Sequence, residues 1–376
     1  MKELKNYRPV SVLTSLSKVF EKYVQRAITP FVETFLSKFI SAYRKTFSTN
    51  HVLLRLIEKW KNALDKKQVV GAVLMDLSKA FDCIPHDLLI AKLHAYGFSE
   101  SSLTFFYSYL KRRKQNVKIN NTYSLLKELL SGVPQGSILG PILFNIFIND
   151  LFLWISNAEL HNFADDNTIS AYSENIQDLI KSLENASGDA IKWFQRNCMI
   201  ANPGKFQSII ICKEKKQLDS VTLTINNKSI QPSGSVKLLG IEIDNSLSFE
   251  SHISSLCRKA AGQLNALFRL KPYLKEAQKM ILVNTFVQSN FNYCPLIWHF
   301  CSKKSANKVE NIQKRALRFV HNDYASNYEV LLSKSNKCTM EVRRLRALAI
   351  EVFRSINKLN PMYIYPKPIS PKFIFK

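Results

Sequence analysis

Cysteine is scarce in this sequence and is not arranged for cross-linking. The chain has 7 cysteines in 376 residues, and none of them shows CxxC or zinc-finger spacing. An odd number without such spacing argues against a disulfide framework and against a structural zinc site, so reduced intracellular thiols are expected. The first residues, MKELKNYRP, contain no apolar run, so no signal peptide is expected.

An uninterrupted long hydrophobic run is also missing. The most apolar stretch, residues 138–155, contains a glycine, a proline, two asparagines and an aspartate. Polar residues at that density are costly inside a bilayer, which favours a buried core helix over a membrane span. We therefore expect no membrane partner.

Acidic residues are few compared with basic ones. The chain has 29 Asp and Glu against 53 Lys and Arg, a net charge of +24 with a pI near 9.7. Residues 251–376 alone contain 22 Lys or Arg and 6 Asp or Glu, a net +16, which leaves +8 for the first 250 residues. This distribution predicts a polyanionic partner, nucleic acid before acidic membrane, bound by the C-terminal third. A solvated helical surface is the alternative.

Two adjacent aspartates stand out in the segment LHNFADDNTISAY, residues 160–172. Residues that favour β-structure flank Asp165 and Asp166 on both sides, which predicts a strand, a tight turn and a second strand. Neighbouring carboxylates repel by up to a few kcal/mol at ~4 Å and an effective dielectric near 20, so they are tolerated when solvated or when a cation lies between them. On its own, the pair is most simply a solvated turn.

A third carboxylate strengthens the case for a cation. The segment VVGAVLMDLSKAFD, residues 69–82, predicts a buried strand from Val69 to Met75 that places Asp76 at its end. Mg²⁺ prefers oxygen ligands, commonly one or two carboxylates with substrate phosphates, and two-metal sites place their ions ~4 Å apart for phosphoryl or nucleotidyl transfer. Asp76, Asp165 and Asp166 are the carboxylates that such a site requires.

These residues carry a resemblance to a known family. Asp76 and the FADD hairpin are similar to motifs A and C of reverse transcriptases, in the LINE-type (non-LTR, jockey-like) branch. SGVPQGSILGPILFNIFINDL (131–151) resembles motif B, and VKLLGIEID (236–244) resembles motif E. NYRPVSVL, AYRKTFST, NYCPLIW and IQKRALRFV also resemble family segments, so that the resemblance covers roughly residues 6–360.

The resemblance implies an α+β right-hand polymerase with fingers, palm and thumb, an RRM-like palm sheet and a helical thumb. We expect fingers at 1–70, palm at 71–248 with a fingers insertion at about 84–132, a basic helical thumb and C-terminal region at 249–360, and a tail at 361–376. Sequence patterns predict helices at 15–38, 56–67, 141–154 and 176–198, strands at 69–75, 207–212, 221–225 and 236–243, and mostly helix after 249 with breaks at Lys271-Pro272 and near Cys294-Pro295.

The implied activity is RNA-directed DNA polymerisation, with an RNA template, a DNA primer, dNTPs and two Mg²⁺ ions for which Mn²⁺ can substitute. By resemblance, Asp76 and Asp165 bind both ions, Asp166 is a weaker ligand, and the carbonyl of Leu77 completes one shell. Phe81, five residues after Asp76, occupies the position of the aromatic steric gate that excludes a ribose 2′-OH. Ordinary core packing is the alternative for Phe81.

Other roles follow from motif positions. The stiff turn with Gln135 and Gly136 would bring backbone amides to the nucleotide and the template base. Lys205 matches the motif D lysine, a general acid for the pyrophosphate leaving group, although an exposed lysine is normally just solvated. We further expect Asp82 to be structural, Arg8, Arg44 and Lys45 to be phosphate ligands, and Lys314, Arg315 and Arg318 to contact nucleic acid.

Some features depart from the family. The sequence has Ala42-Tyr43 where the family often has Gly-Phe. Autonomous LINE-type proteins usually carry an upstream endonuclease and a Cys/His knuckle, so the chain resembles the polymerase part of a longer polyprotein or a genomic remnant. Three hypotheses stay open: an active LINE-type polymerase in the nucleus and cytoplasm, a domesticated, telomerase-like or maturase-like enzyme, and a non-enzymatic nucleic-acid-binding remnant.

Overall fold

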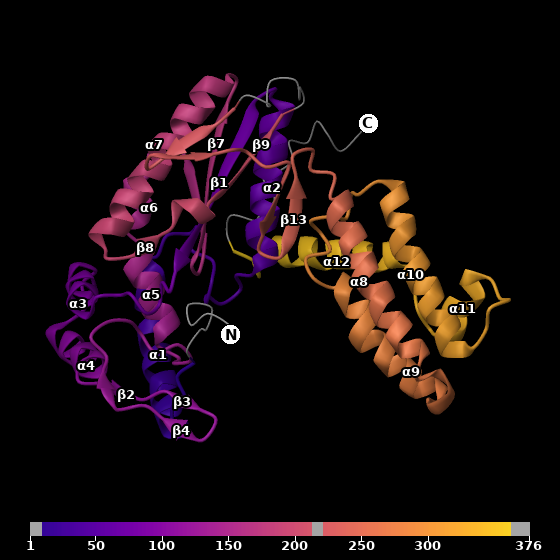
Figure 1. Ribbon diagram of the computed structural model, residues 1–376, viewed down its shortest axis with the longest axis horizontal. Coiled ribbons are helices and arrows are strands. Elements are labelled where there is room, and N and C mark those ends of the chain that lie inside the picture. Colours follow the sequence, from indigo (N-terminus) through magenta and orange to yellow (C-terminus); the bar gives the residue numbers. More distant parts are fainter. Residues whose placement is uncertain (1–9, 213–220, 362–376) are drawn as a thin grey trace. The chain divides into compact units, whose positions relative to one another are not determined.

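The computed structural model describes residues 10–212 and 221–361 (Figure 1). Contacts divide the chain into two compact units. The sheet unit contains residues up to 45, 67–210 and 214–232, and the C-terminal unit contains 46–66, 211–213 and 233 onwards.

The sheet unit is built on a five-stranded sheet in the order β6-β7-β1-β8, with β9 also paired to β1. Its strands are β1 (Val69–Ser78), β6 (Glu159–Phe163), β7 (Asp166–Ser173), β8 (Ile200–Ala201) and β9 (Gln207–Ile211). β1 pairs antiparallel with β7 along most of its length. Val70, Ala72 and Val73 on β1 are all fully buried, so both faces of this strand are covered, which explains its continuous apolar sequence.

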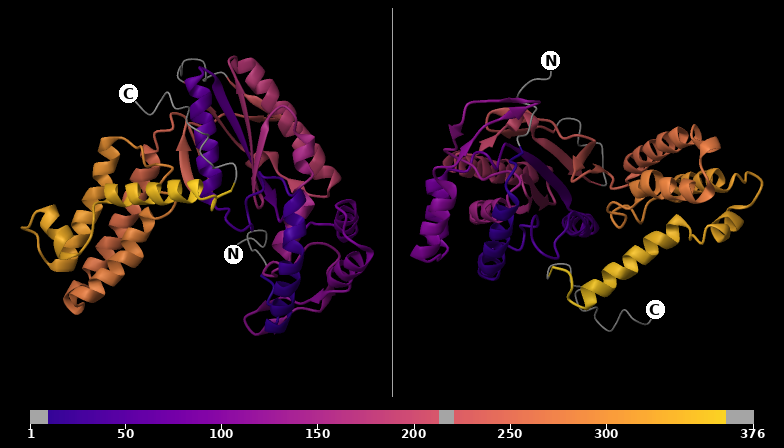
Figure 2. Two further views of the ribbon diagram at one scale, coloured as in Figure 1. Left: turned by 180° about the vertical axis from the view of Figure 1, so that it is seen from behind. Right: turned by 90° about the horizontal axis from the view of Figure 1, so that it is seen from below.

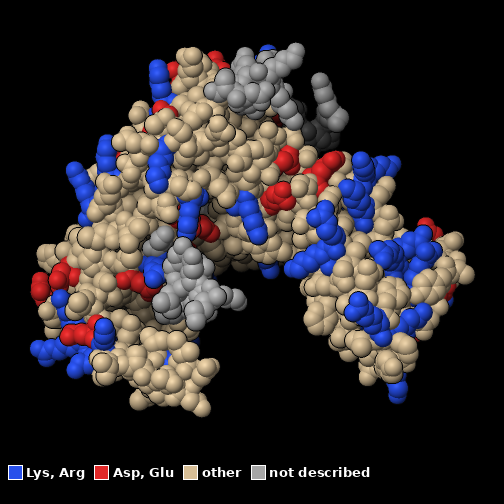
Figure 3. Space-filling view, viewed as in Figure 1, with Lys and Arg blue, Asp and Glu red and all other residues tan. Residues whose placement is uncertain are grey.

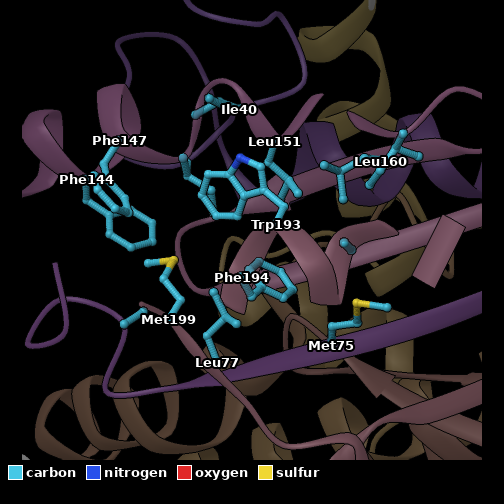
Figure 4. Packing of buried hydrophobic residues seen from close by; sticks show 14 of the residues in the cluster. Ile40, Met75, Leu77, Phe144, Phe147, Leu151, Leu160, Trp193, Phe194 and Met199 are labelled. Atoms are coloured by element: carbon cyan, nitrogen blue, oxygen red, sulfur yellow. The ribbon is translucent and has the colours of Figure 1, made fainter. Parts of the chain in front are cut away.

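Helix α7 (Ile176–Arg196) packs along β1 and β7 and contacts the short helix α6 (Leu151–Trp154) (Figure 1). Gly71 on β1 allows this close approach, because a Cβ there would lie 2.5 Å from Leu183 Cδ1 on α7. Side chains of α5 (Gly140–Ile148), α7 and β1 meet in the core around Trp193, as Figure 4 shows. The sheet is therefore anchored by large buried side chains.

The remaining elements of the sheet unit are helices and small ladders. α3 (His86–Ala95) packs on α4 (Glu100–Leu110) and on α5, and α1 (Ser15–Phe35) adds buried side chains to the same core. The small ladders are β2 (Lys114–Gln115) with β5 (Lys127–Glu128), β3 (Lys118–Ile119) with β4 (Thr122–Tyr123), and β10 (Leu223–Ile225) with β11 (Lys228–Ile230).

The C-terminal unit is mainly helical. It comprises α2 (Thr49–Asp65), the hairpin of β12 (Ser235–Leu238) and β13 (Ile241–Asp244), α8 (Glu250–Phe268), η4 (Lys271–Tyr273), α9 (Glu276–Leu282), η5 (Val283–Val287), η6 (Gln288–Phe291), α10 (Lys303–His321), α11 (Tyr328–Lys334) and α12 (Met340–Ile356). α10 contacts α8, α9, α11 and α12, so it is the central helix. Figure 2 shows the helices that follow residue 250 in orange and yellow.

The α+β class predicted from the sequence is confirmed, and so are the helix breaks at Pro272 and near Cys294, where Cys294 has a φ of 43°. Two elements differ. The predicted helix 141–154 is interrupted between α5 and α6, where the side chain of Asn149 accepts a hydrogen bond from Ser37 N and donates one to the carbonyl of Phe35. The predicted strand 236–243 is a tight hairpin.

The unit boundaries also differ from the predicted subdomain boundaries. α2, predicted in the fingers, groups with the C-terminal unit, where His51 bonds Glu351 and Thr49 contacts Cys294. Residues 233–248, predicted in the palm, group there too. Across residues 10–212 and 221–361, no helix is both long enough and apolar enough to cross a membrane.

Candidate active site

The acidic residues meet where β1 ends beside the β6–β7 hairpin. Asp76 lies opposite Asp166 in the antiparallel register of β1 and β7. Phe163 pairs with Asp166 across the hairpin, so Ala164 and Asp165 form a two-residue turn. The sheet register thus brings Asp76 together with Asp165 and Asp166, which follow it by 89 and 90 positions in the sequence.

The turn adopts an unfavourable backbone conformation that its neighbours hold in place. Ala164 has a φ of 56°, in the left-handed region that costs a residue with a Cβ roughly 1–2 kcal/mol. The side-chain amide of Asn162 donates to the carbonyl of Ala164 at 2.6 Å and to Asn167 Oδ1 at 3.0 Å. Asn167 Nδ2 donates to the carbonyl of Asp165 at 3.2 Å. Both asparagines are buried, so this clamp fixes the hairpin tip.

Sequence reasoning missed these two asparagines. Their signal is the symmetric placement around the acidic pair in NFADDN. Asparagine tolerates turns and bonds nearby backbone, so the pattern is detectable from the sequence.

The carboxylates differ in exposure. Asp76 and Asp166 are exposed, and Asp165 is half-buried. In the described parts of the chain, no group of three or more His, Cys, Asp or Glu side chains is arranged to hold a metal ion by itself. The strand residue that follows Asp76, Leu77, is buried and lies opposite Ala201 of β8.

Phe81, five residues after Asp76, has two aromatic neighbours. Its ring stacks on Phe144 of α5, with centroids 4.5 Å apart and an interplanar angle of 21°. Tyr43 meets Phe81 edge-on at 6.1 Å and 87°. Burial, and then the negative charge of Asp165, raise the pKa of Tyr43. Phe81 itself is half-buried at the edge of the core.

The motif B turn lies beside the same region. Gly136 is exposed, and its φ of 109° is one that a side chain would strain. The amide of Gln135 donates to Asp82 Oδ1 at 2.8 Å, and its backbone carbonyl accepts from Ser11 N at 2.8 Å. The prediction that Asp82 is structural is consistent with this contact, and Gln135 is held by it.

A buried glutamate that sequence reasoning missed binds the backbone between the Gln135–Gly136 turn and α5. Glu21 of α1 is fully buried, and its Oε2 accepts from Ile138 N at 2.6 Å and Leu139 N at 3.3 Å, just before α5 begins. Tyr109 donates to Oε1 of the same carboxylate. A negative charge at a helix N-terminus is stabilising, so Glu21 anchors the start of α5. A single acidic residue on an amphipathic helix gives little sequence signal for this role.

The predicted phosphate ligands of the fingers have different environments. Arg44 donates to the carbonyls of Ser37 and Ile40 at 2.8 and 2.9 Å and forms an ion pair with Glu33, and only 7% of its side chain is exposed. These contacts hold Arg44 in its loop, and its role as a phosphate ligand stays a prediction. Lys45 is exposed, and Arg8 lies outside the described residues.

Lys205 is exposed in the short helix η2 (Pro203–Lys205), which contacts β1. β8 ends at Ala201, opposite Leu77, so the loop that carries Lys205 leaves the sheet next to the end of β1. The structure therefore brings Lys205 to the same edge of the sheet as Asp76.

The basic residues of the C-terminal unit are distributed over several helices. Lys and Arg side chains gather on the face of this unit that Figure 3 presents. On α10, Arg315 is exposed and bonds Asn265 at 3.3 Å, whereas Lys314 and Arg318 are half-buried. A polar cavity of about 340 Å³ is lined by Asn284, Gln288, Asn292, Asn336, Lys337, Cys338, Arg343 and Arg346. The sequence did not single out this cavity.

Comparisons with known proteins give the family of the chain. Relatives include the probable RNA-directed DNA polymerase from transposon BS of Drosophila melanogaster, 30% identical over 330 residues, and the RNA-directed DNA polymerase from mobile element jockey of Drosophila funebris, 26% identical over 328 residues. Each alignment covers 84% of this chain and 36% of the relative, so the chain spans about a third of their length. The predicted resemblance to jockey-like elements is confirmed.

Among solved structures, apo telomerase from Candida tropicalis is similar with a TM-score of 0.46 and 15% identity, over 91% of this chain and 56% of that one. Residues 1–243, well over half of the chain, match the family described as reverse transcriptase (RNA-dependent DNA polymerase). The chain belongs to the reverse transcriptase family.

Proposed function

We propose that this chain is the polymerase region of a jockey-like non-LTR element and catalyses RNA-directed DNA synthesis, extending a DNA primer with dNTPs on an RNA template. The register of Asp76 opposite Asp166, which directly follows the Ala164–Asp165 turn, is the observation that carries this proposal. It supports the proposal because acidic residues from the two segments that resemble motifs A and C lie opposite one another at one end of the paired strands.

The donor set suits Mg²⁺ or Mn²⁺. We assign Asp76 and Asp165 as the main ligands, with Asp166 and the carbonyl of Leu77 as further oxygens. Since Mg²⁺ is commonly bound by one or two carboxylates together with substrate phosphates, a site without a complete protein cage is compatible with it. When bound, two divalent ions stabilise the attacking and leaving oxygens of an in-line displacement.

Residues around the carboxylates would bind and select the nucleotide. Phe81 would pack against the sugar, and the Gln135–Gly136 turn would face the nascent base pair. Lys205, exposed at the same edge, would donate a proton to the pyrophosphate. Lys45 remains a candidate for the triphosphate.

The C-terminal unit would hold the template and primer through phosphate contacts. Its positive charge supports this role, and Lys314, Arg315 and Arg318 are the assigned contacts. A nuclear and cytoplasmic location, as expected for such elements, belongs to the same proposal.

Primer extension on poly(rA)/oligo(dT) with Mg²⁺ tests the function. We expect dTMP incorporation that stops when the metal is chelated. Binding of the primer-template without any incorporation would instead favour the non-enzymatic remnant.

A further inference from the structure

The segment that leads up to Arg44, residues 39–42, is fixed to the sheet and to α5. Ser41 N donates to the carbonyl of Asn162 at 3.1 Å, and Asn162 N donates to the carbonyl of Phe39 at 3.2 Å. The buried amide of Asn145 on α5 donates to the carbonyl of Ala42 at 2.8 Å. Asn162 also clamps the acidic turn, so one residue supports both this segment and the hairpin tip.

Tyr43 leaves this fixed segment in an unusual conformation. Ala42 is 1% exposed, whereas Tyr43 is 54% exposed and has a φ of 61°, in the left-handed region. A bulky residue persists there only where its surroundings impose the conformation, and such positions cluster at functional sites. Arg44, bonded to two carbonyls and to Glu33, holds the next residue in place.

The Tyr43 ring is directed at Phe81. The two rings meet edge-to-face, a favourable arrangement for aromatic pairs, and Phe81 also stacks on Phe144. Phe81 is therefore oriented by one ring from α5 and by one ring from the fixed segment before Arg44. Its position relative to the carboxylates depends on both.

We propose that Tyr43 is a positioning residue for sugar selection: its ring fixes the orientation of Phe81, and through Phe81 it sets the discrimination between deoxyribonucleotides and ribonucleotides. This inference rests on the proposed function, because it requires Phe81 to contact the sugar. The ring carries the effect, and the hydroxyl does not.

Three variants separate these contributions. Tyr43→Ala removes the ring but keeps a Cβ at the same φ, so the backbone cost is matched. Tyr43→Phe keeps the ring and removes the hydroxyl. Phe105→Ala removes a half-buried ring elsewhere in the same core and controls for general loss of packing.

Single-nucleotide incorporation with dNTP and rNTP measured side by side gives the selectivity. We expect Tyr43→Ala to lower the dNTP/rNTP preference by about 2- to 12-fold, the factor that corresponds to one aromatic pair. Tyr43→Phe and Phe105→Ala should keep the wild-type preference. An unchanged preference in Tyr43→Ala, or the same loss in Phe105→Ala, would overturn the proposal.

A spectroscopic measurement tests the positioning without catalysis. With 4-fluorophenylalanine at position 81 of the full chain, the ¹⁹F resonance should shift or narrow in Tyr43→Ala and stay unchanged in Tyr43→Phe. The same spectrum in all three proteins would overturn the positioning role. A wild-type chain that incorporates no dNTP would refute the proposed function instead, and the ¹⁹F result would still decide how Phe81 is held.

Discussion

The roles of the sheet unit and of the C-terminal unit are inferred from different features of the molecule. In the sheet unit, strand register places Asp76 opposite Asp166, and buried asparagines fix the turn between Phe163 and Asp166. In the C-terminal unit, what suggests a role is the excess of Lys and Arg over several helices, with α10 at their centre. The candidate site of the sheet unit is therefore defined by the positions of a few side chains, and the candidate binding surface of the C-terminal unit by its positive charge.

This difference predicts how each unit responds to substitution. A site that depends on the position of a few oxygens should fail when one of them is changed. A surface that binds phosphates should weaken in steps, and its response should depend on salt.

The largest effect should come from the carboxylates. Asp76→Asn or Asp165→Asn should lower nucleotide incorporation by three or more orders of magnitude, roughly 4 kcal/mol of transition-state stabilisation, while binding of the primer-template changes little. Asp178→Asn, an exposed aspartate in the first turn of α7, is the matched control. Retention of more than a few per cent of activity in either active-site variant would refute the assignment. For Asp166→Asn we expect a loss that is milder or equal.

The next effect should come from the charges of α10. Replacing Lys314, Arg315 and Arg318 by Gln should lower the salt slope of primer-template binding by roughly 0.9 per lost phosphate contact, and weaken binding by up to about 100-fold near 0.15 M salt. Point substitutions are preferable to truncation after residue 250, because α2 and residues 233–248 belong to the same compact unit.

Lys181→Gln with Lys192→Gln on α7, compared per charge removed, is the control for this experiment. Equal slopes in the wild type and the triple variant would mean that these residues are only solvated. A lower salt slope in the α10 variant, but not in the α7 variant, would locate phosphate binding on the C-terminal unit.

The sequence predicted the parts of the sheet unit that depend on local pattern. Strand β1, helix α7 and the acidic hairpin follow from apolar periodicity and turn residues, and the order of the motifs identified the family. The contact of Glu21 with the start of α5 links residues 118 positions apart, so no local pattern reveals it. The clamp by Asn162 lies within NFADDN, and there the sequence does contain a local signal.

The C-terminal unit was less predictable for a physical reason. Net charge locates a surface only to within a third of the chain, because helix packing decides which cations reach solvent. Packing of α10 against four helices leaves Lys314 and Arg318 half-buried. The membership of α2 in this unit depends on contacts such as His51 with Glu351, 300 residues apart.

A smaller effect is expected when Phe81, which belongs to the sheet unit, is replaced. Phe81→Val should admit ribonucleotides with a selectivity loss of tenfold or more, about 1.4 kcal/mol or greater, because a smaller side chain leaves room for the 2′-OH. Use of deoxynucleotides should fall less. Phe105→Val should lose packing without a change in selectivity. If Phe81→Val loses both activities in proportion, its contact with Phe144 is ordinary core packing.

The smallest effect concerns the contact between α2 and α12. Glu351 accepts from His51 Nε2 and from Asn360 Nδ2, each at 2.9 Å. The hydrogen bond from His51 lowers the pKa of Glu351, although burial opposes this shift. A lowered carboxyl pKa in the folded state stabilises the fold above the unfolded value near 4.3, and that stabilisation is lost as the pH falls through the folded pKa.

Glu351→Gln should therefore lower the free energy of unfolding of the C-terminal unit at pH 7 by about 1–2 kcal/mol, and the difference from the wild type should shrink below about pH 4. Urea unfolding of both proteins between pH 3 and 7 measures this difference in the free energy of unfolding. On α2, Glu58→Gln is the control: burial raises the pKa of Glu58, so removal of its charge should be neutral or slightly stabilising at pH 7. A pH-independent difference for Glu351→Gln would show that the charge of Glu351 does not stabilise the contact between α2 and α12.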